Sequence, residues 1–197
     1  MVEFLLSLDE ALFLYLNSFY NPHLDNTMLL LSSELIWIPL YFLLLWKSYK
    51  ILKIKDFYYF LGGLLLCITL ADQVTSRFMK PSFERLRPSH APHLAGKVHL
   101  VKKNTGELYK GGKYGFASSH AANTFALALW FFLFFGHKKG WKWLFAWAGL
   151  VSYTRLYLGV HYPLDLLVGA IVGMIISFSL HKFLIYFYKT TNKNKGI

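Results

Sequence analysis

The chain has 197 residues, of which 55% are hydrophobic and 19% aromatic, while only 16% are charged. This composition is too apolar for a soluble domain of this size and indicates an integral membrane protein. The formal net charge is +11. Because the Lys and Arg residues lie between apolar runs and form no basic arm, nucleic acid is excluded as an expected partner, and anionic lipid headgroups are favoured.

Apolar segments recur along most of the chain and predict one all-α domain over 1–197, a polytopic transmembrane helix bundle. A helix needs on the order of 20 residues to cross a hydrocarbon layer of roughly 30 Å. Five segments are long and apolar enough, namely 27–46, 57–79, 118–136, 141–158 and 162–186. They predict five spans.

The N-terminal segment 4–19 is shorter, and its leucines recur at helical spacing between polar residues. We expect an interfacial amphipathic helix, with a sixth span as the alternative. The first residues, MVEFLLSLDEALF, lack the basic start of a secretory signal. We therefore expect them to stay in the mature protein. Cys67 is the only cysteine, which excludes an intrachain disulfide, and it is expected to be a small core residue.

Basic residues test the orientation of the bundle. Alternating spans put the lysines within 47–55, 138–142 and 182–195 on one side, and those of the 80–117 loop on the other. The positive-inside rule does not decide between sides of nearly equal charge. Because several basic residues of the 80–117 loop are expected to bind substrate, we assign this loop to the periplasmic or outer face of the cell inner membrane.

Within that outward-facing loop, KVHLVKKNTGELYK alternates apolar and polar residues around an Asn104-Thr105-Gly106 turn signal. This pattern predicts a short β-hairpin, which could cover a site beneath it.

The first polar motif is KPSFERLRP, in which Lys80 and Arg87 are separated by six residues. Two fixed cations suit a phosphate, because a guanidinium binds two oxygens in a fork and an ammonium adds a point charge. Anchoring of a helix at the headgroups is the alternative. Asp72 and Gln73 lie about two turns earlier and are candidates to support the site.

The second motif is YGFASSHAANTF, where Ser118 and Ser119 stand at the start of an apolar helix and His120 lies in its first turn. The free N–H groups of a helix start make an anion site. The alternative is that the serines only cap the helix and that His120 is an interfacial side chain.

The third motif is TRLYLGVHYPLD, with Arg155, then His161, then Asp165 four residues further on. If Pro163 begins a helix, Asp165 can accept a hydrogen bond from one ring nitrogen of His161. The other nitrogen then keeps its lone pair as a nucleophile. A structural His–Asp pair is the alternative, although ionisable groups at membrane depth are usually functional.

Taken together in this order, the three motifs resemble the type-2 phosphatidic acid phosphatase superfamily, in its small bacterial membrane branch. The resemblance runs from about residue 57 to 175. Two departures occur: Ala117-Ser118-Ser119-His120 stands where the family has Pro-Ser-Gly-His, and Thr154-Arg155 where it has Ser-Arg. Ser119 adds a Cβ where the backbone meets phosphate, but its hydroxyl could itself bind an oxygen.

The resemblance implies a role for each motif residue. His161 would attack phosphorus and form a phosphohistidine, Asp165 would orient it, and His120 would protonate the leaving oxygen and then activate water. The substrate-binding set would be Lys80, Arg87, Ser118, Ser119 and Arg155. No metal or cofactor is implied.

A metal site is the alternative that three further histidines raise. His90, His93 and His99 lie in the long loop, but their spacing matches no common metal site.

The expected activity is that of a metal-independent lipid phosphatase or diphosphatase, acting on a long-chain lipid in the bilayer. Polyprenyl diphosphate is the first expectation for the substrate, with lipid A and phosphatidylglycerol phosphate close behind. A lipid phosphotransferase and a nonenzymatic lipid-phosphate binding or transport protein are the alternatives, and a vanadate-dependent haloperoxidase ranks last because those relatives are soluble. No obligate protein partner is expected.

Overall fold

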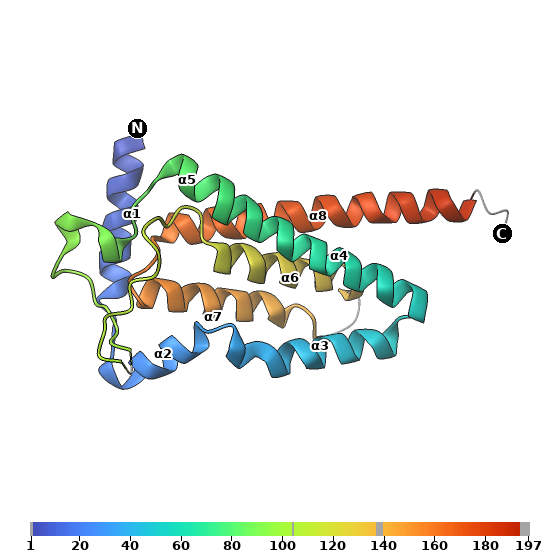
Figure 1. The fold of residues 1–197 in the computed structure, drawn as a ribbon, viewed down its shortest axis with the longest axis horizontal. Helices are drawn as coiled ribbons and strands as arrows, with labels where there is room; N and C mark the ends of the chain where they lie inside the picture. The colour runs from blue at the N-terminus through green and yellow to red at the C-terminus, as the bar shows by residue number, and fades with distance from the viewer. Residues whose placement is uncertain (1, 104, 137–139, 194–197) are drawn as a thin grey trace.

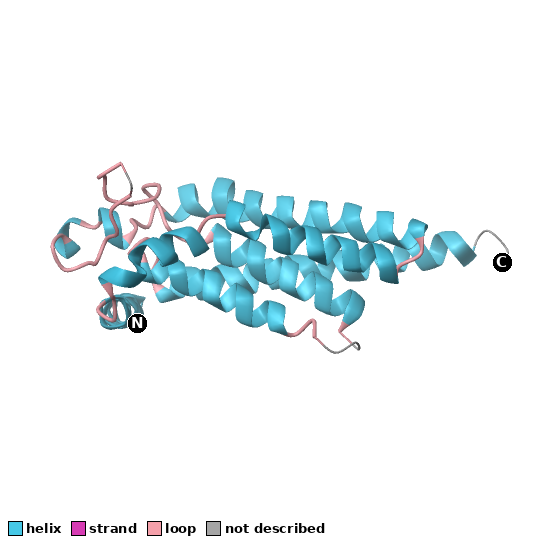
Figure 2. Cartoon of the chain, turned by 90° about the horizontal axis from the view of Figure 1, so that it is seen from below, coloured by secondary structure: helices cyan, strands magenta, loops and turns pink. Residues whose placement is uncertain are grey.

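A computed structural model describes residues 2–103, 105–136 and 140–193, with side chains up to residue 187. In this part of the chain the fold is entirely helical, without strands (Figure 2). The expected all-α class is thereby confirmed. The α-helices are α1 Val2–Asn17, α2 Asp25–Leu31, α3 Ile38–Ile51, α4 Ile54–Gln73, α5 Lys80–Phe83, α6 Ser119–Phe135, α7 Trp143–Tyr157 and α8 Pro163–Lys193.

Five helices, α3, α4, α6, α7 and α8, run along a common direction, and α1 crosses one end of this bundle (Figures 1 and 2). Helix α6 is central and contacts α4, α7 and α8. Helix α1 packs on α7 and α8. It crosses the bundle end, and the interfacial helix expected for segment 4–19 stays a prediction.

The number of membrane spans is smaller than expected when judged by length and composition. In the described residues two helices are long and apolar enough to cross a membrane, Ile54–Phe83 and Pro163–Phe187, and a bent pair makes a possible third. Helix α6 is apolar but has only 17 residues. The expected count of five or six spans is therefore not confirmed.

The bent pair overlaps the predicted span near 27–46 and shows that this segment consists of two helices. Segment Pro22–Leu31 ends before Ser32, and Leu35–Ile51 continues at an angle of 68°. Three polar residues, Ser32, Ser33 and Glu34, occupy the break. A proline in the first turn of α3 suits a new helix start, because proline lacks the N–H that a helix interior requires.

Helices α6 and α8 approach closely through small residues. A Cβ added to Gly169 would lie 2.4 Å from the Ser118 carbonyl oxygen, and one added to Gly173 would lie 2.1 Å from that of Ala122. Only glycine permits so close an approach of the two helices at these positions. The contact joins the start of α6 to the first turns of α8.

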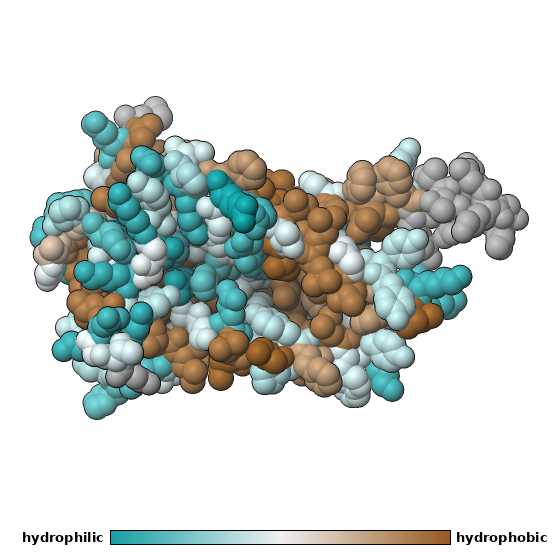
Figure 3. Space-filling view, in the orientation of Figure 1, coloured by the Kyte–Doolittle hydropathy of each residue, from teal (hydrophilic) through white to brown (hydrophobic). Residues whose placement is uncertain are grey.

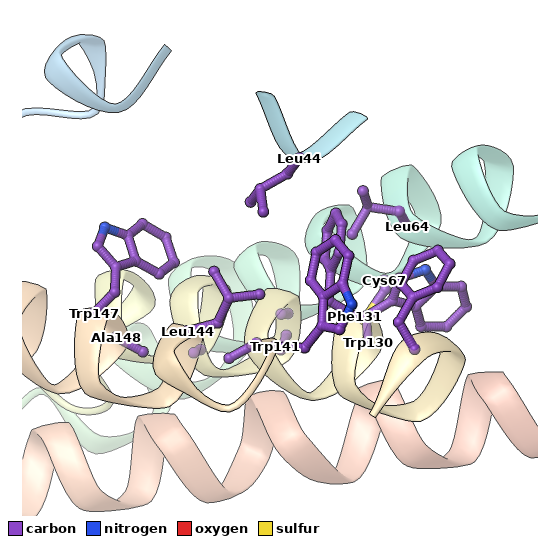
Figure 4. Close-up of a cluster of buried hydrophobic side chains, with 14 of the residues drawn as sticks. Leu44, Leu64, Cys67, Trp130, Phe131, Trp141, Leu144, Trp147 and Ala148 are labelled. Carbon is purple, nitrogen blue, oxygen red and sulfur yellow. The ribbon is translucent and has the colours of Figure 1, made fainter. Parts of the chain in front are cut away.

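The middle of the bundle is an aromatic cluster (Figure 4). Phe131 and Trp141 stack with ring centroids 5.3 Å apart, and Trp130 is fully buried beside Cys67. Aromatic pairs of this kind bury large areas and add about 0.5–1.5 kcal/mol beyond area burial. Cys67 is a core residue, as predicted.

The outer surface of the bundle middle is apolar as well. Figure 3 shows a hydrophobic band between two more hydrophilic ends. Large side chains such as Phe42, Leu65 and Ile175 are more than half exposed. Such a surface fits contact with lipid chains, since water would disfavour it.

The loop between α5 and α6 corrects the expected hairpin. The described residues contain only isolated antiparallel bridges, Lys102 with Leu108 and Leu86 with Tyr114. The Tyr109 N–H donates to the Val101 carbonyl at 2.8 Å, but the pairing does not extend into a strand. Asn104, at the predicted turn, lies outside the described residues, as do Lys138, Lys139 and Lys195.

Candidate active site

The three predicted motifs meet at the bundle end that α1 crosses. They lie at the start of α5, the start of α6, and the connection from α7 to α8. The Lys80 ammonium donates to Ser119 Oγ at 2.7 Å, and the Ser118 N–H donates to the Asp165 carbonyl at 2.9 Å. These bonds link the first motif to the second and the second to the third.

Lys80 follows a π-helical turn, Val74–Met79, near the end of the span Ile54–Phe83. Such turns often occur at functional sites because they redirect the following side chains. Ser119 Oγ also lies 2.9 Å from Thr75 Oγ1 and 2.8 Å from Ser76 Oγ. Ser119, which stands where the family has glycine, therefore supplies the hydroxyl that positions the Lys80 ammonium.

Asp72 contacts this cluster indirectly, through Ser76. Its carboxylate accepts from Ser76 Oγ at 3.2 Å, and the Gln73 amide donates to it at 3.4 Å. Asp72 and Gln73 end α4, before the π-helical turn that leads to Lys80, and Gln73 reaches the cluster only through Asp72, so their supporting role stays a prediction beside the alternative of a structural polar contact.

Arg87 is buried and oriented by backbone. Its Nε donates to the Tyr114 carbonyl at 3.0 Å, while Nη1 has no hydrogen-bond partner among the described residues. A Cβ at Gly111 would lie 2.5 Å from Nη1, and Gly111 has a φ of +67°. Burial, with the nearby charge of Arg155, lowers the pKa of Arg87 to about 10, so it stays cationic at neutral pH.

Arg155 is almost fully buried at the end of α7. Its Nη1 donates to Ser32 Oγ and to Tyr109 Oη, the latter at 2.9 Å. Its Nε is buried without a partner in the part of the chain that the structure describes. Ser32 and Tyr109 were not predicted, because they come from the helix break and the long loop, and neither carries a motif.

The His161–Asp165 pair lies within the protein. Asp165 Oδ2 lies 3.4 Å from His161 Nδ1 and accepts from the Tyr162 N–H at 3.0 Å. Burial, reinforced by the charges of Arg87, Arg155 and Lys80, holds the pKa of His161 well below its usual range. The ring is neutral, and a proton on Nδ1 facing Asp165 leaves the Nε2 lone pair free.

Gly115 makes room for this pair. A Cβ at Gly115 would lie 2.9 Å from Asp165 Oδ2 and 3.6 Å from His161 Nδ1. A residue with a Cβ could therefore not bring its backbone this close to the His161–Asp165 pair.

Arg85 is a site residue that sequence reasoning missed. Its Nη1 donates to Asp165 Oδ1 at 2.8 Å, and its Nη2 donates to Asp9 Oδ2 on α1 at 2.7 Å. Its guanidinium lies 4.0 Å from the centroid of the Tyr162 ring. The only signal was its place between Lys80 and Arg87, because nothing in the sequence indicated that α1 would reach it.

The start of α6 carries the remaining predicted residues. Ser118 is fully buried and caps the helix, with Oγ accepting from the Ala121 N–H at 3.4 Å. The preceding first-turn N–H groups have no intrahelical acceptor and can bind an anion. His120 is half-buried and interacts electrostatically with Arg155, His161, Lys80 and Arg87.

A cavity of ≈ 370 Å³ leads from His120 into the bundle between α3, α4, α6 and α7. Its walls are mainly apolar, including Trp37, Leu44, Leu64, Ile68, Leu127 and Phe131. The polar site thus opens beside a space suited to hydrocarbon.

The loop histidines each have a separate partner. His93 lies 2.8 Å from Glu10, His99 lies 3.0 Å from Asp25, and His90 lies 3.1 Å from Ser89 Oγ. In the described ranges, no group of three or more His, Cys, Asp or Glu side chains is placed to hold a metal ion.

The fold and the site define a helical membrane protein whose cationic cradle surrounds a buried, oriented histidine. The model of the PAP2 superfamily matches residues 60–189, and the chain belongs to this superfamily.

Two curated relatives are lipid A 4'-phosphatases. The Bacteroides thetaiotaomicron protein is 39% identical over 176 residues, which cover 88% of this chain and 75% of that protein. The Porphyromonas gingivalis protein is 35% identical over 185 residues, which cover 94% and 76%. The crystal structure of Aquifex aeolicus LpxE superposes with a TM-score of 0.62 at 27% identity, covering 89% of this chain and 95% of that one.

These likenesses confirm that the chain is a PAP2 phosphatase, a hydrolase, with lipid phosphatases as relatives. They do not favour polyprenyl diphosphate, the first expectation for the substrate.

Proposed function

We propose that this protein hydrolyses a phosphate monoester of lipid A through a phosphohistidine intermediate on His161. The observation that carries the chemistry is the neutral, fully buried His161 with Nδ1 facing Asp165 and three cations around it. The substrate choice is supported by the names of the two relatives at 39% and 35% identity. Phosphatidylglycerol phosphate and polyprenyl diphosphate rank behind.

In the first step Nε2 of His161 attacks phosphorus, and the bond from phosphorus to the lipid oxygen breaks. Lys80, Arg87 and Arg155 neutralise the non-bridging oxygens as charge builds in the transition state. The negative phosphate also favours the protonated ring of His120, which then gives its proton to the leaving oxygen. The lipid departs as an alcohol.

In the second step water attacks the phosphohistidine, and His120 accepts a proton from that water. The bond between phosphorus and Nε2 breaks, inorganic phosphate leaves, and His161 returns to its neutral form. His120 ends the cycle protonated, as it began with substrate bound. Asp165 stabilises the positive charge that the His161 ring carries while phosphorylated.

The cavity beside His120 supports a lipid substrate. Its apolar walls between α3 and α4 suit an acyl chain, and a buried CH₂ contributes about 0.8 kcal/mol. A phosphate bound at the bundle end can therefore be joined to a chain that lies within the bundle.

We further infer that the site faces the periplasm. The end of α3 and the start of α4 lie toward the bundle end opposite α1 (Figure 1), and the chain there carries the exposed lysines Lys47, Lys50 and Lys53, which suits the cytoplasm. In a Cys67→Ser background, a membrane-impermeant maleimide applied to intact cells should label Lys103→Cys and spare Lys53→Cys. The reverse pattern would invert the orientation.

The decisive experiment is a substrate panel on the purified protein with EDTA present. Phosphate release is measured from lipid A, phosphatidylglycerol phosphate, polyprenyl diphosphate and phosphatidic acid. We expect the highest kcat/KM on lipid A, with free phosphate as the product, which separates hydrolysis from transfer. A higher value on another lipid would overturn the substrate assignment.

The same panel tests the nucleophile. His161→Ala should be inactive, while the matched control His93→Ala, an exposed histidine paired with Glu10, should keep wild-type activity. Full activity in His161→Ala would overturn the assignment of the phosphohistidine.

A further inference from the structure

Helix α1 is amphipathic in an unusual sense, because two of its polar residues, Asp9 and Asn17, face the protein. Asp9, Phe13 and Asn17, spaced four residues apart, are buried, with exposed fractions of 8%, 0% and 2%. The opposite face carries Phe4, Leu8 and Tyr15, each of which is at least 50% exposed. The inward face therefore makes specific contacts, while the outward face suits lipid at the membrane surface.

The Asp9 carboxylate joins α1 to the site at two points. Oδ2 accepts from Arg85 Nη2 at 2.7 Å, and Oδ1 accepts from the Leu164 N–H at 2.8 Å. Leu164 is in the first turn of α8, where backbone N–H groups lack intrahelical acceptors. Asp9 thus caps α8 and holds the arginine that contacts Asp165.

Arg85 lies between two carboxylates and bonds each with a different nitrogen. Nη1 reaches Asp165 Oδ1 at 2.8 Å, while Asp165 Oδ2 faces His161 and the Tyr162 N–H. Both oxygens of Asp165 are therefore committed, which prevents rotation of its carboxylate. Asp165 has no solvent exposure, and Arg85 is the cation paired with it.

Asn17 fixes the other end of the same connection. Its Nδ2 donates to the carbonyl of Tyr157 at 2.9 Å and to that of Leu156 at 3.1 Å, where α7 ends. Its Oδ1 accepts from the His99 N–H at 2.7 Å. Helix α1 therefore braces the connection from α7 to α8 that carries His161.

We propose that Asp9 and Arg85 are positioning residues, through which α1 holds the Asp165 carboxylate against Nδ1 of His161. This inference rests on the proposed role of His161 as the nucleophile. Neither residue contacts the substrate phosphate in this scheme, since Lys80, Arg87 and Arg155 form the cradle. A neutral His161 presents Nε2 to phosphorus only while Nδ1 keeps its proton, and a carboxylate held by Arg85 secures that tautomer.

The test compares kcat with KM in full-length variants. Arg85→Met should lower kcat roughly ten- to a hundredfold, as loss of a partner behind an orienting group typically does, while KM for p-nitrophenyl phosphate and for lipid A changes less than about twofold. Arg85→Lys should recover only part of the rate, because one ammonium cannot span both carboxylates in the same fork. Asp9→Asn should lower kcat less than Arg85→Met does.

The matched control is Glu10→Gln, which removes the same charge from the adjacent residue of α1. Glu10 pairs with the exposed His93 and lies outside the Arg85 network, so this variant should keep wild-type kcat. The double variant Asp9→Asn/Arg85→Met should be no slower than Arg85→Met, because both act through one unit. Multiplied losses, or an unchanged kcat in Arg85→Met, would overturn the inference.

A spectroscopic measurement separates positioning from folding and from the proposed reaction. In protein carrying ¹⁵N-histidine, with His161 assigned through His161→Asn, the wild type should show Nδ1 protonated and Nε2 unprotonated. Arg85→Met should show both tautomers although it remains folded. An unchanged tautomer would overturn the positioning role, whereas a wild type that releases no phosphate from any ester would overturn the proposed function alone.

Discussion

The bundle end beside α1 and the aromatic cluster around Trp130 are both buried, but different forces hold them. At the bundle end polar side chains are held by individual partners at hydrogen-bond distance, such as Lys80 with Ser119 and Arg85 with Asp165. In the cluster Trp130, Phe131 and Trp141 are held by contact area. Hydrogen bonds fix direction, whereas apolar packing mainly fixes volume.

This difference teaches which substitutions separate activity from stability. A change of one atom at the bundle end removes a direction or a charge without leaving a large void, so it should affect the rate most. A truncation in the cluster leaves a cavity far from the reacting atoms, so it should affect the free energy of unfolding most.

The largest loss of activity without loss of stability is expected from His161→Asn. Asparagine keeps polarity at the site but has no lone-pair nitrogen to attack phosphorus, so kcat should fall by about a thousandfold or more. Phosphate release from lipid A measures the rate, and a thermal melt in the same detergent should stay close to wild type. A variant that lost its fold together with its activity would remove the contrast.

The opposite result, a loss of stability without loss of activity, is expected from Trp130→Ala. Trp130 is fully buried and its Nε1 donates to the Phe60 carbonyl at 3.3 Å, so truncation should cost roughly 3–5 kcal/mol of unfolding free energy. The apparent melting temperature should fall, while kcat well below it stays near wild type. Trp143→Ala, at a position that is 46% exposed, is the control and should melt close to wild type.

A smaller effect is expected from Ser119→Ala, which tests the departure from the family glycine. The methyl group cannot accept the Lys80 hydrogen bond, and a bond to a charged group is worth about 1.5–3 kcal/mol. We therefore expect kcat/KM to fall by roughly tenfold to a hundredfold. Ser82→Ala, on an exposed position of α5, is the control, and equal rates in the two variants would contradict the role of Ser119.

The smallest effect is a dependence of stability on pH. The pKa of His161 is lowered in the folded protein, mainly by burial, whereas the unfolded chain has an ordinary pKa of about 6.5. Below that pH the unfolded state binds a proton that the native state does not, so stability falls as the pH decreases. His90, whose pKa is also lowered by burial and by Lys110, acts in the same direction.

Melts of wild type and His161→Asn between pH 8 and pH 5 measure this effect. The wild-type curve should fall more steeply than that of the variant below about pH 6.5, by at most about 1.4 kcal/mol for each pH unit. Parallel curves would show that His161 is not held neutral by the fold.

Several features could be predicted because their signals are local. The apolar run of α8 predicts a helix, and the four-residue spacing of Gly169 and Gly173 predicts a close contact with another helix. The site motifs could be predicted from the residue types that phosphate chemistry requires. The catalytic roles assigned to them remain proposals that the experiments above test.

Other features depended on contacts between distant segments. The break at Ser32 belongs to a segment whose hydropathy alone suggests one span, and that serine contacts Arg155, far along the chain. The predicted hairpin was reduced to a bridge at Lys102 and Leu108, because alternation does not show whether a ladder will extend. Asp9 carried no motif at all.

The sequence by itself determined that this protein is helical, membrane-embedded and equipped with the three polar motifs, because hydropathy, spacing and residue chemistry are local properties. Only the tertiary structure decided that Ser119 receives Lys80 and that α1 reaches Asp165 through Arg85. These contacts depend on where helices from different parts of the chain come to rest. That placement follows from packing of the whole bundle, which no single segment encodes.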